Sequence, residues 1–234
     1  MHNLWKYSPI LWFLERLFHW MEYLSPANLL FGTRVQAQRQ FTTEQEMKEA
    51  MLARGRKIEG YILAWLVVEI ALALLAPNST GWVQKICVAL PLFRIFEITQ
   101  TSINLNIFER LRIKASDSHF VASHIRTVVL TIWNIFELML CFGIVYSAAS
   151  NLITPIGDVL DPYYFSVVTQ LTVGYGDINP VGWGRFLAAA QGTLGFFFAL
   201  VILTRLTTFL PRSEAILRHA GEEHRFPPRP DDPQ

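Results

Sequence analysis

The 234-residue chain has few of the residues that support most soluble functions. Only 17% of its residues are charged, against about 25% in an ordinary soluble domain, while 52% are hydrophobic. The two cysteines, Cys87 and Cys141, lie far apart within apolar runs, so neither a disulfide framework nor a metal-binding spacing is indicated. The net charge of +1 gives no reason to expect a nucleic-acid partner. This composition predicts a membrane protein.

The segments between the apolar runs also lack the motifs of common catalytic sites. They contain no glycine-rich nucleotide fingerprint, no nucleophile elbow and no paired carboxylates. His119, His124 and Asp117 could suggest a metal or catalytic site, but loop histidines close to Arg126 are more typical of a solvated surface. We therefore expect no enzyme activity, no organic cofactor and no soluble ligand-binding domain. A membrane enzyme is the remote alternative.

Four apolar segments are long enough to cross a bilayer, which requires about 20 residues. They cover roughly residues 58–76, 82–107, 127–149 and 185–206. Lys and Arg gather in the other segments, with six in 33–57, four in 108–126 and five from residue 205 onward. None occurs in 77–84 or 150–184. Because basic loops stay on the cytoplasmic side, this alternation predicts a multi-pass protein of the cell membrane with both termini in the cytoplasm.

The stretch before the first span has its own pattern. Residues 9–24 are rich in aromatic side chains and carry a narrow polar stripe at Glu15, His19 and Glu22. This pattern predicts a helix lying in the cytoplasmic interface, with a fifth span as the alternative. A capping box that starts at Thr43 predicts a cytosolic helix leading into the first span.

A short helix and a glycine-containing stretch lie between the third and fourth spans. Asp161 and Pro162 match the N-cap and first position of a helix of about ten residues, which is half a bilayer. The sequence at 172–177 then reads TVGYGD. Non-helical backbone at membrane depth is tolerated where it lines a polar cavity or is buried in protein. A re-entrant loop is therefore predicted.

The TVGYGD stretch resembles the selectivity filter of the potassium channel family at every position, and residues 127–206 resemble its outer helix, pore helix, filter and inner helix. The resemblance implies an all-α membrane protein with four transmembrane helices plus a re-entrant pore helix and filter loop, assembled as a homotetramer. It implies a filter at Thr172, Val173, Gly174, Tyr175 and Gly176, in which the carbonyl oxygens of residues 172–175 and the Thr172 hydroxyl bind K+. To point successive carbonyls at one axis the backbone must alternate in handedness, which Gly174 and Gly176 permit without steric cost.

Further residues are expected to support the filter and its outer mouth. Tyr163, Tyr164 and Phe165 of the pore helix are the expected neighbours of the outward-pointing Val173 and Tyr175 side chains. The acidic residues of the mouth should concentrate cations, and they are Asp158, Asp161 and Asp177.

Two positions depart from the family pattern. Leu171 stands where the family more often has a second threonine, and Val168 stands where some bacterial relatives have a glutamate behind the filter. Both substitutions either change filter stability and inactivation or are simple packing variants.

The last span carries two glycines that could serve gating. Gly195 falls where the family commonly has a hinge glycine, and Gly192 is the second candidate; the alternative is a role in close helix packing. Beyond them, Ala199, Leu203 and Leu206 are expected to approach the fourfold axis and form a hydrophobic gate. The gating stimulus is not predicted.

Four ionisable residues fall inside the spans, namely Glu69, Arg94, Glu97 and Glu137. Arg94 and Glu137 lie about 12 residues from the outer ends of their spans, so we expect them to pair at similar depth, with Glu69 as the next partner. These charges either hold the first two spans to the pore or, in the alternative, let Arg94 sense voltage with a shallow dependence.

The sequence thus predicts a channel that conducts K+ passively, with identical chains and membrane lipids as partners. The alternatives are a non-conducting or modulatory subunit and an ion-coupled transporter, although a transporter would need inverted repeats. The expected regions are cytoplasmic and interfacial helices (1–57), a transmembrane hairpin (58–107), a cytoplasmic linker (108–126), a pore domain (127–210) and a disordered cytoplasmic tail (211–234).

Overall fold

The computed structural model describes residues 9–22, 44–104 and 124–206, which are helical over most of their length. Its four long helices are α4 (Glu44–Leu75), α5 (Gly81–Ile103), α7 (His124–Ala148) and α9 (Trp183–Leu206). Each of them contains a segment that is long and apolar enough to cross a membrane. The predicted all-α membrane architecture with four spans is confirmed.

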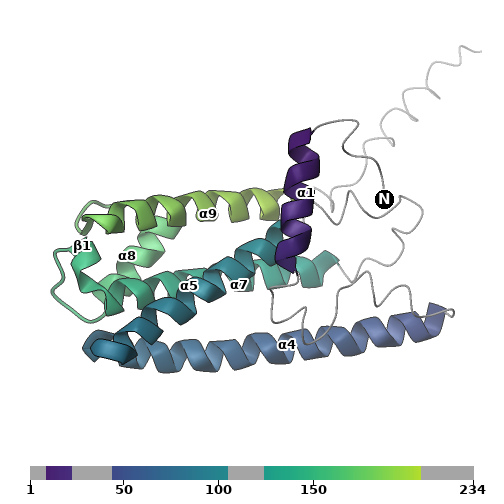
Figure 1. Ribbon diagram of the computed structural model, residues 1–234, viewed down its shortest axis with the longest axis horizontal. Coiled ribbons are helices and arrows are strands. Elements are labelled where there is room, and N and C mark those ends of the chain that lie inside the picture. Colours follow the sequence, from purple (N-terminus) through teal and green to yellow (C-terminus); the bar gives the residue numbers. More distant parts are fainter. Residues whose placement is uncertain (1–8, 23–43, 105–123, 207–234) are drawn as a thin grey trace, which may run out of the picture.

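The long helices run along a common direction, and the shorter helices differ from them in orientation (Figure 1). Helix α1 (Pro9–Glu22) has 14 residues, which is too short for a span, and it lies across the direction of the long helices. This placement favours the interfacial reading of residues 9–24 over a fifth span. Helix α8 (Asp161–Gln170) is the short helix between α7 and α9.

Helices α4 and α5 form the predicted hairpin, joined by the short 3-10 helix η2 (Ala76–Asn78). The helix expected in the cytosol and the first span are one continuous helix of 32 residues, so the expected boundary near residue 57 is not a break in the backbone. Only 11% of the span in α4 is buried within the chain, against 44% in α5. Within the single chain, helix α4 is therefore much less covered by other elements than α5 is.

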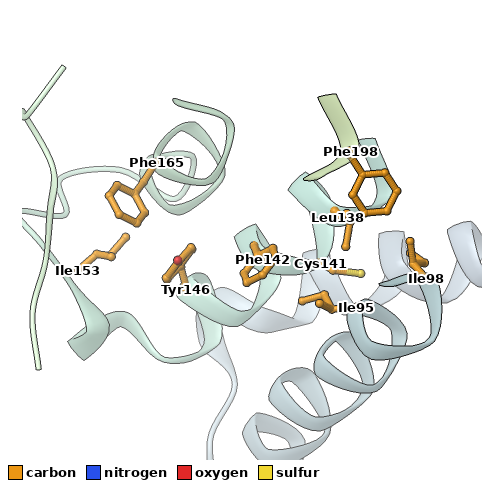
Figure 2. Close-up of a cluster of buried hydrophobic side chains, with 9 residues drawn as sticks. All are labelled: Ile95, Ile98, Leu138, Cys141, Phe142, Tyr146, Ile153, Phe165 and Phe198. Carbon is orange, nitrogen blue, oxygen red and sulfur yellow. The ribbon is translucent and has the colours of Figure 1, made fainter. Parts of the chain in front are cut away.

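Helix α7 is the centre of the structure. Half of its span is buried, and it packs against α4, α5, α8 and α9. Its contacts with α5, α8 and α9 include one hydrophobic cluster, shown in Figure 2, which comprises Ile95, Ile98, Leu138, Cys141, Phe142, Tyr146, Ile153, Phe165 and Phe198. A second cluster joins Ile144 of α7 to Leu72 of α4. The short helix α8 is thus held against a buried helix on one side, which gives the loop that follows it a fixed support.

Two short strands bracket the loop between α7 and α9. Strand β1 (Ile153–Thr154) follows the 3-10 helix η5 (Ser150–Leu152) and pairs antiparallel with β2 (Asn179–Pro180). The Val181 amide adds a hydrogen bond of 2.8 Å to the Leu152 carbonyl oxygen. These contacts hold the beginning and the end of the loop together.

Several predictions from the sequence fall on residues outside the described ranges. They concern Thr43, most of the 108–126 linker including Asp117 and His119, and the tail from residue 207.

Candidate functional site

The helix that leads into the TVGYGD stretch starts one residue earlier than the sequence predicts. Asp161 is the first helical residue and Leu160 occupies the N-cap, so the prediction of Asp161 as the cap is wrong. The Asp161 carboxylate instead accepts hydrogen bonds from the amides of Gly157 and Asp158, at 2.6 and 2.9 Å. These two donors lower the pKa of Asp161 below its usual value. The acidic side chain therefore orders the preceding loop and not the first turn of α8.

After α8 the backbone alternates in handedness along the TVGYGD stretch. Thr172, Gly174 and Gly176 have positive φ angles of 56°, 56° and 80°, whereas Val173 and Tyr175 do not. The two glycines adopt this conformation at little cost. Thr172 is β-branched, and a left-handed conformation of such a residue costs about 1–3 kcal/mol, so the surrounding structure must hold it there.

In the TVGYGD stretch, the first backbone amides are hydrogen-bonded to α8, whereas most of the carbonyl oxygens accept no hydrogen bond from a described residue. The amides of Thr172 and Val173 donate to the carbonyl oxygens of Thr169 and Val168, at 3.1 and 2.9 Å, so they fold back onto the last turn of α8. The Gly176 carbonyl oxygen accepts a hydrogen bond of 3.0 Å from the Asn179 side chain. No described residue donates a hydrogen bond to the carbonyl oxygens of residues 172–175. Four consecutive carbonyls are thus left available to a ligand, and Gly176 is not one of them.

An aromatic contact supports the outer half of the loop. The rings of Tyr164 and Tyr175 stack with an interplanar angle of 2° and a centroid distance of 6.4 Å. The Tyr164 hydroxyl donates a hydrogen bond of 2.8 Å to Asp177, and this bond raises the pKa of Tyr164. Tyr164 is therefore the expected neighbour of Tyr175.

Tyr163 contacts α4 and α7, whereas Phe165 lines a pocket together with Thr172, Gly174 and Gly176 of the loop. The Tyr163 hydroxyl donates to the Ala73 carbonyl oxygen of α4, and the ring lies against Gly143 of α7. Phe165 packs edge-on against Tyr146, with ring centroids 5.0 Å apart. Of the three aromatic side chains predicted around the filter, these two fasten α8 to the rest of the bundle.

The two residues that depart from the family pattern occupy different environments. Val168 is buried, whereas the Leu171 side chain is 54% exposed and faces an open pocket of about 450 Å³. Thr172 and Gln170 line the same pocket. Leu171 thus lies at the inner side of the loop and not behind it.

Gly195 in α9 lies directly against the end of α8. A Cβ atom at this position would overlap the Gln170 carbonyl oxygen, whereas a Cβ atom at Gly192 would meet nothing within 4 Å. Helix α9 runs unbroken through both glycines from Trp183 to Leu206. The chain therefore needs a glycine at position 195 for close packing beside the loop, independently of any hinge role.

The residues expected to form a gate follow Gly195 along α9. Ala199, Leu203 and Leu206 all line the 450 Å³ pocket and are exposed in the single chain. The pocket is mainly apolar at this end of α9, which is the property that closing by dewetting requires.

A buried polar network behind the loop was not found from the sequence. The Gln191 amide donates to the Ser166 carbonyl oxygen and hydroxyl at 2.9 and 2.8 Å, and the Tyr146 hydroxyl donates to the Gln191 side chain at 3.1 Å. The Ser166 hydroxyl donates to the Met139 carbonyl oxygen at 2.7 Å. The network joins α7, α8 and α9. A glutamine within a predicted span was the available signal, because such a side chain needs a polar partner.

The four intramembrane charges meet at the junction of α4, α5 and α7. Arg94 donates to both oxygens of Glu137 at 2.9 and 3.0 Å and to Glu97 at 2.8 Å. Its Nε atom lies 3.9 Å from a carboxylate oxygen of Glu69. All four side chains are at most 3% exposed. Arg94 therefore connects the hairpin to α7, which is the partner of α8.

The three acidic residues predicted for the outer mouth are all accessible at the surface of the single chain. Asp158 and Asp177 are exposed, and Asp161 is partly exposed. Among the described residues no group of three His, Cys, Asp or Glu side chains is placed to hold a metal ion. The candidate cation ligands of this site remain the carbonyl oxygens of residues 172–175, to which no described residue donates a hydrogen bond.

Comparisons with known proteins match parts of the chain. Residues 134–212 match a family model described as "Ion channel". Protein LctB of Geobacillus stearothermophilus is 48% identical over 59 residues, which are 25% of this chain and 42% of LctB. LctB of Bacillus caldotenax is 47% identical over 45 residues, covering 19% of this chain and 34% of the relative.

The human potassium voltage-gated channel subfamily KQT member 4 is 38% identical over 76 residues, which are 31% of this chain and 11% of that protein. This chain spans less than half the length of each of these three relatives. No solved structure gives a match. Residues 134–212 are therefore similar to the ion channel family, and part of the chain is similar to a potassium channel.

Proposed function

We propose that the chain forms a pore that conducts K+ passively and selectively across the cell membrane. The observation that carries this proposal is the backbone of residues 172–176. Positive φ angles at every second residue coincide there with four carbonyl oxygens that accept no hydrogen bond from a described residue. Partial dehydration of a cation is favourable when a closely spaced set of such oxygens replaces its water.

A single chain offers one carbonyl oxygen per layer, so a complete coordination shell requires several copies around one axis. The loop side chains are exposed in the single chain, with Tyr175 at 71% and Val173 at 48%. Apolar side chains of this size at membrane depth need a protein partner or lipid. A homotetramer would supply it and would place four carbonyls in each layer, as the potassium channel resemblance implies.

The inner side of the pore is assigned to α9. In a ring of four chains the pocket lined by Leu171, Ala199 and Leu203 would face the conduction path below the filter. Gating is assigned to the inner helices, to the filter, or to both, since Gly195 links α9 to the residue that precedes Leu171. The excess of Lys and Arg outside residues 77–84 and 150–184 supports an orientation with both termini in the cytoplasm.

The proposal can be tested with a pair of glycine substitutions. Gly174 and Gly182 have φ angles of 56° and 52°, and a Cβ atom at either one meets nothing within 4 Å of the chain. Gly174→Ala and Gly182→Ala therefore introduce similar backbone strain, but only the first lies in the filter. We expect both proteins to fold and only Gly174→Ala to lose selectivity for K+ over Na+.

The measurement is cation flux from liposomes that contain the purified chain, with a K+ gradient and a Na+ gradient in parallel samples. Barium-sensitive K+ flux without Na+ flux in the wild type and in Gly182→Ala is the expected result. Flux that does not distinguish the two ions in the wild type would overturn the proposed selectivity. A protein that assembles but carries no flux would instead be a non-conducting or modulatory subunit.

A further inference from the structure

The charge cluster between the hairpin and α7 contains more acidic than basic groups. Arg94 is surrounded by three carboxyl groups, those of Glu69, Glu97 and Glu137. If all four side chains were ionised, the cluster would carry a net charge of −2 within the membrane-spanning bundle. Buried charge is tolerated when it is paired and hydrogen-bonded. The number of donors in the cluster therefore decides which carboxyl groups can be ionised.

Two of the three carboxyl groups are well supplied with donors. Glu137 accepts a hydrogen bond from Arg94 at each of its oxygens. Glu97 accepts from Arg94 and also from the Tyr61 hydroxyl, which lies 3.0 and 2.9 Å from its two oxygens. The rings of Tyr61 and Trp65 lie 5.5 and 5.4 Å from the Arg94 guanidinium carbon and hold it in this position. These two groups can remain carboxylates.

Glu69 is in a different situation. Its side chain is fully buried, and its Oε2 atom has no hydrogen-bond partner among the residues that the structure describes. Its Oε1 atom lies 3.4 Å from the Cys141 sulfur and 3.9 Å from Arg94 Nε, and no described residue accepts a hydrogen bond from Nε. Glu69 lies 14 residues from one end of its span and nine from the other, or about 21 and 14 Å, so bulk water is far away. A carboxylate at this point would be almost without donors.

We propose that Glu69 is a proton-binding site within the bundle, and that its proton leaves Arg94 hydrogen-bonded to Glu137. The geometry points to a neutral Glu69 carboxyl group whose contact partner is Cys141 of α7. The titratable and charged groups that face it are Arg94 and Glu97 from α5, Glu137 and Cys141 from α7, and Tyr61 from its own helix. Loss of the proton would place a third anion beside Arg94, next to its Nε atom, where it would compete with Glu137 for the guanidinium group.

This site has a consequence for the junction between the hairpin and the pore. Arg94 and Glu137 form the ionic link between α5 and α7, and α7 supports α8 through the buried cluster. Proton release from Glu69 would weaken that link. The hairpin would then be fastened to the pore segment more strongly at low pH than at high pH. The inference concerns the protonation of the bundle and does not depend on the proposed conduction of K+.

The direct test is infrared spectroscopy of the full chain in lipid, using the C=O stretching band of a protonated carboxyl group. At pH 7 we expect this band in the wild type and in the control Glu49→Gln, which changes an exposed carboxylate on the same helix. Glu69→Gln, an isosteric replacement of the neutral acid, should lose the band. Cys141→Ala, which removes the contact partner, should keep the band at a shifted frequency.

A stability measurement gives an independent readout. A proton held by Glu69 in the folded chain and released in the unfolded chain makes the unfolding constant of the wild type rise about tenfold per pH unit, relative to Glu69→Gln, above about pH 5. This rise should end where the infrared band disappears. The proposal is overturned if the wild type has no such band, if Glu69→Gln or Cys141→Ala leaves the band unchanged, or if the two unfolding constants keep a constant ratio.

Discussion

Replacement of Arg94 by methionine should be one of the most damaging single substitutions in the hairpin. Arg94 is 3% exposed and makes three hydrogen bonds of 3.0 Å or less to Glu97 and Glu137. Methionine fills a similar volume, but it leaves these acceptors without their donor. Removing one partner of a buried ion pair costs about 3–5 kcal/mol, because the remaining charge is uncompensated. We expect a loss in this range for Arg94→Met.

The hairpin offers a matched control at the membrane boundary. Lys85 lies on the same helix and also contacts an aromatic ring, that of Trp82 at 4.7 Å, but its side chain is exposed. An exposed cation–π contact contributes about 0.5–1 kcal/mol, so Lys85→Met should cost no more than that. Both variants remove one positive charge from α5. The difference between them therefore isolates the effect of burial.

The assay is the loss of helical circular dichroism when SDS is titrated into mixed micelles that contain the purified chain. We expect the unfolding free energy to fall by several times more for Arg94→Met than for Lys85→Met. An equally small loss in the two variants would contradict this expectation, because the buried pairing of α5 with α7 would then contribute nothing to stability.

Two further predictions concern the pore segment. Gly195→Ala should destabilise the chain by about 1–3 kcal/mol, because the new Cβ atom overlaps the Gln170 carbonyl oxygen. Gly192→Ala should be neutral or slightly stabilising, because its Cβ atom meets no other atom within 4 Å. The same SDS titration measures both variants, and equal effects would contradict the packing role of Gly195. The pKa of Asp161 is lower in the folded chain than in the unfolded chain because its carboxylate accepts hydrogen bonds from Gly157 and Asp158. These bonds therefore stabilise the folded chain at pH values above the usual pKa of an aspartate, and this stabilisation is lost as the pH falls through the lowered pKa. Amide hydrogen exchange at residues 157 and 158 should therefore be protected at neutral pH and become faster in acid, and Asp161→Asn should remove this pH dependence; protection that stays constant with pH would argue against it.

Residue periodicity and motif spacing were sufficient to predict the architecture. The four spans, the hairpin and the short helix before residue 172 follow from apolar length and from the glycine-containing stretch. The meeting of Arg94 with Glu137 could be expected because equal distances from the outer ends of two spans imply equal depth. These features depend on local sequence and on the thickness of a bilayer, and both can be read without coordinates.

Other features depend on tertiary contacts and could not be read in this way. The positive φ angle of Thr172 goes against the preference of a β-branched residue. It accompanies a hydrogen bond from the Thr172 amide to the Thr169 carbonyl oxygen in the last turn of α8. The prediction of Asp161 as the N-cap is wrong by one residue because its carboxylate accepts a hydrogen bond from the Gly157 amide of the preceding loop. The sequence does not show whether an aspartate will bond the amides before it or those of the first helical turn. The hydrogen bond of Gln191 could not be predicted from the sequence because its partner, Ser166, lies 25 residues away on another helix.

The contact of Gly195 with the end of α8 also changes how its role is understood. The sequence offered a hinge and a packing position as alternatives, and the structure gives a physical reason for the second without testing the first. A packing contact at this point would transmit movement of α9 to the residue that precedes Leu171. Hinge and contact are thus compatible within one helix.

The central claim is that the carbonyl oxygens of residues 172–175 select K+. The most direct measurement is the reversal potential of the purified chain in a planar bilayer, with K+ on one side and Na+ on the other. We expect a reversal potential displaced far from zero, in the direction set by K+ permeation alone. A reversal potential near zero, with current carried equally by both ions, would contradict it.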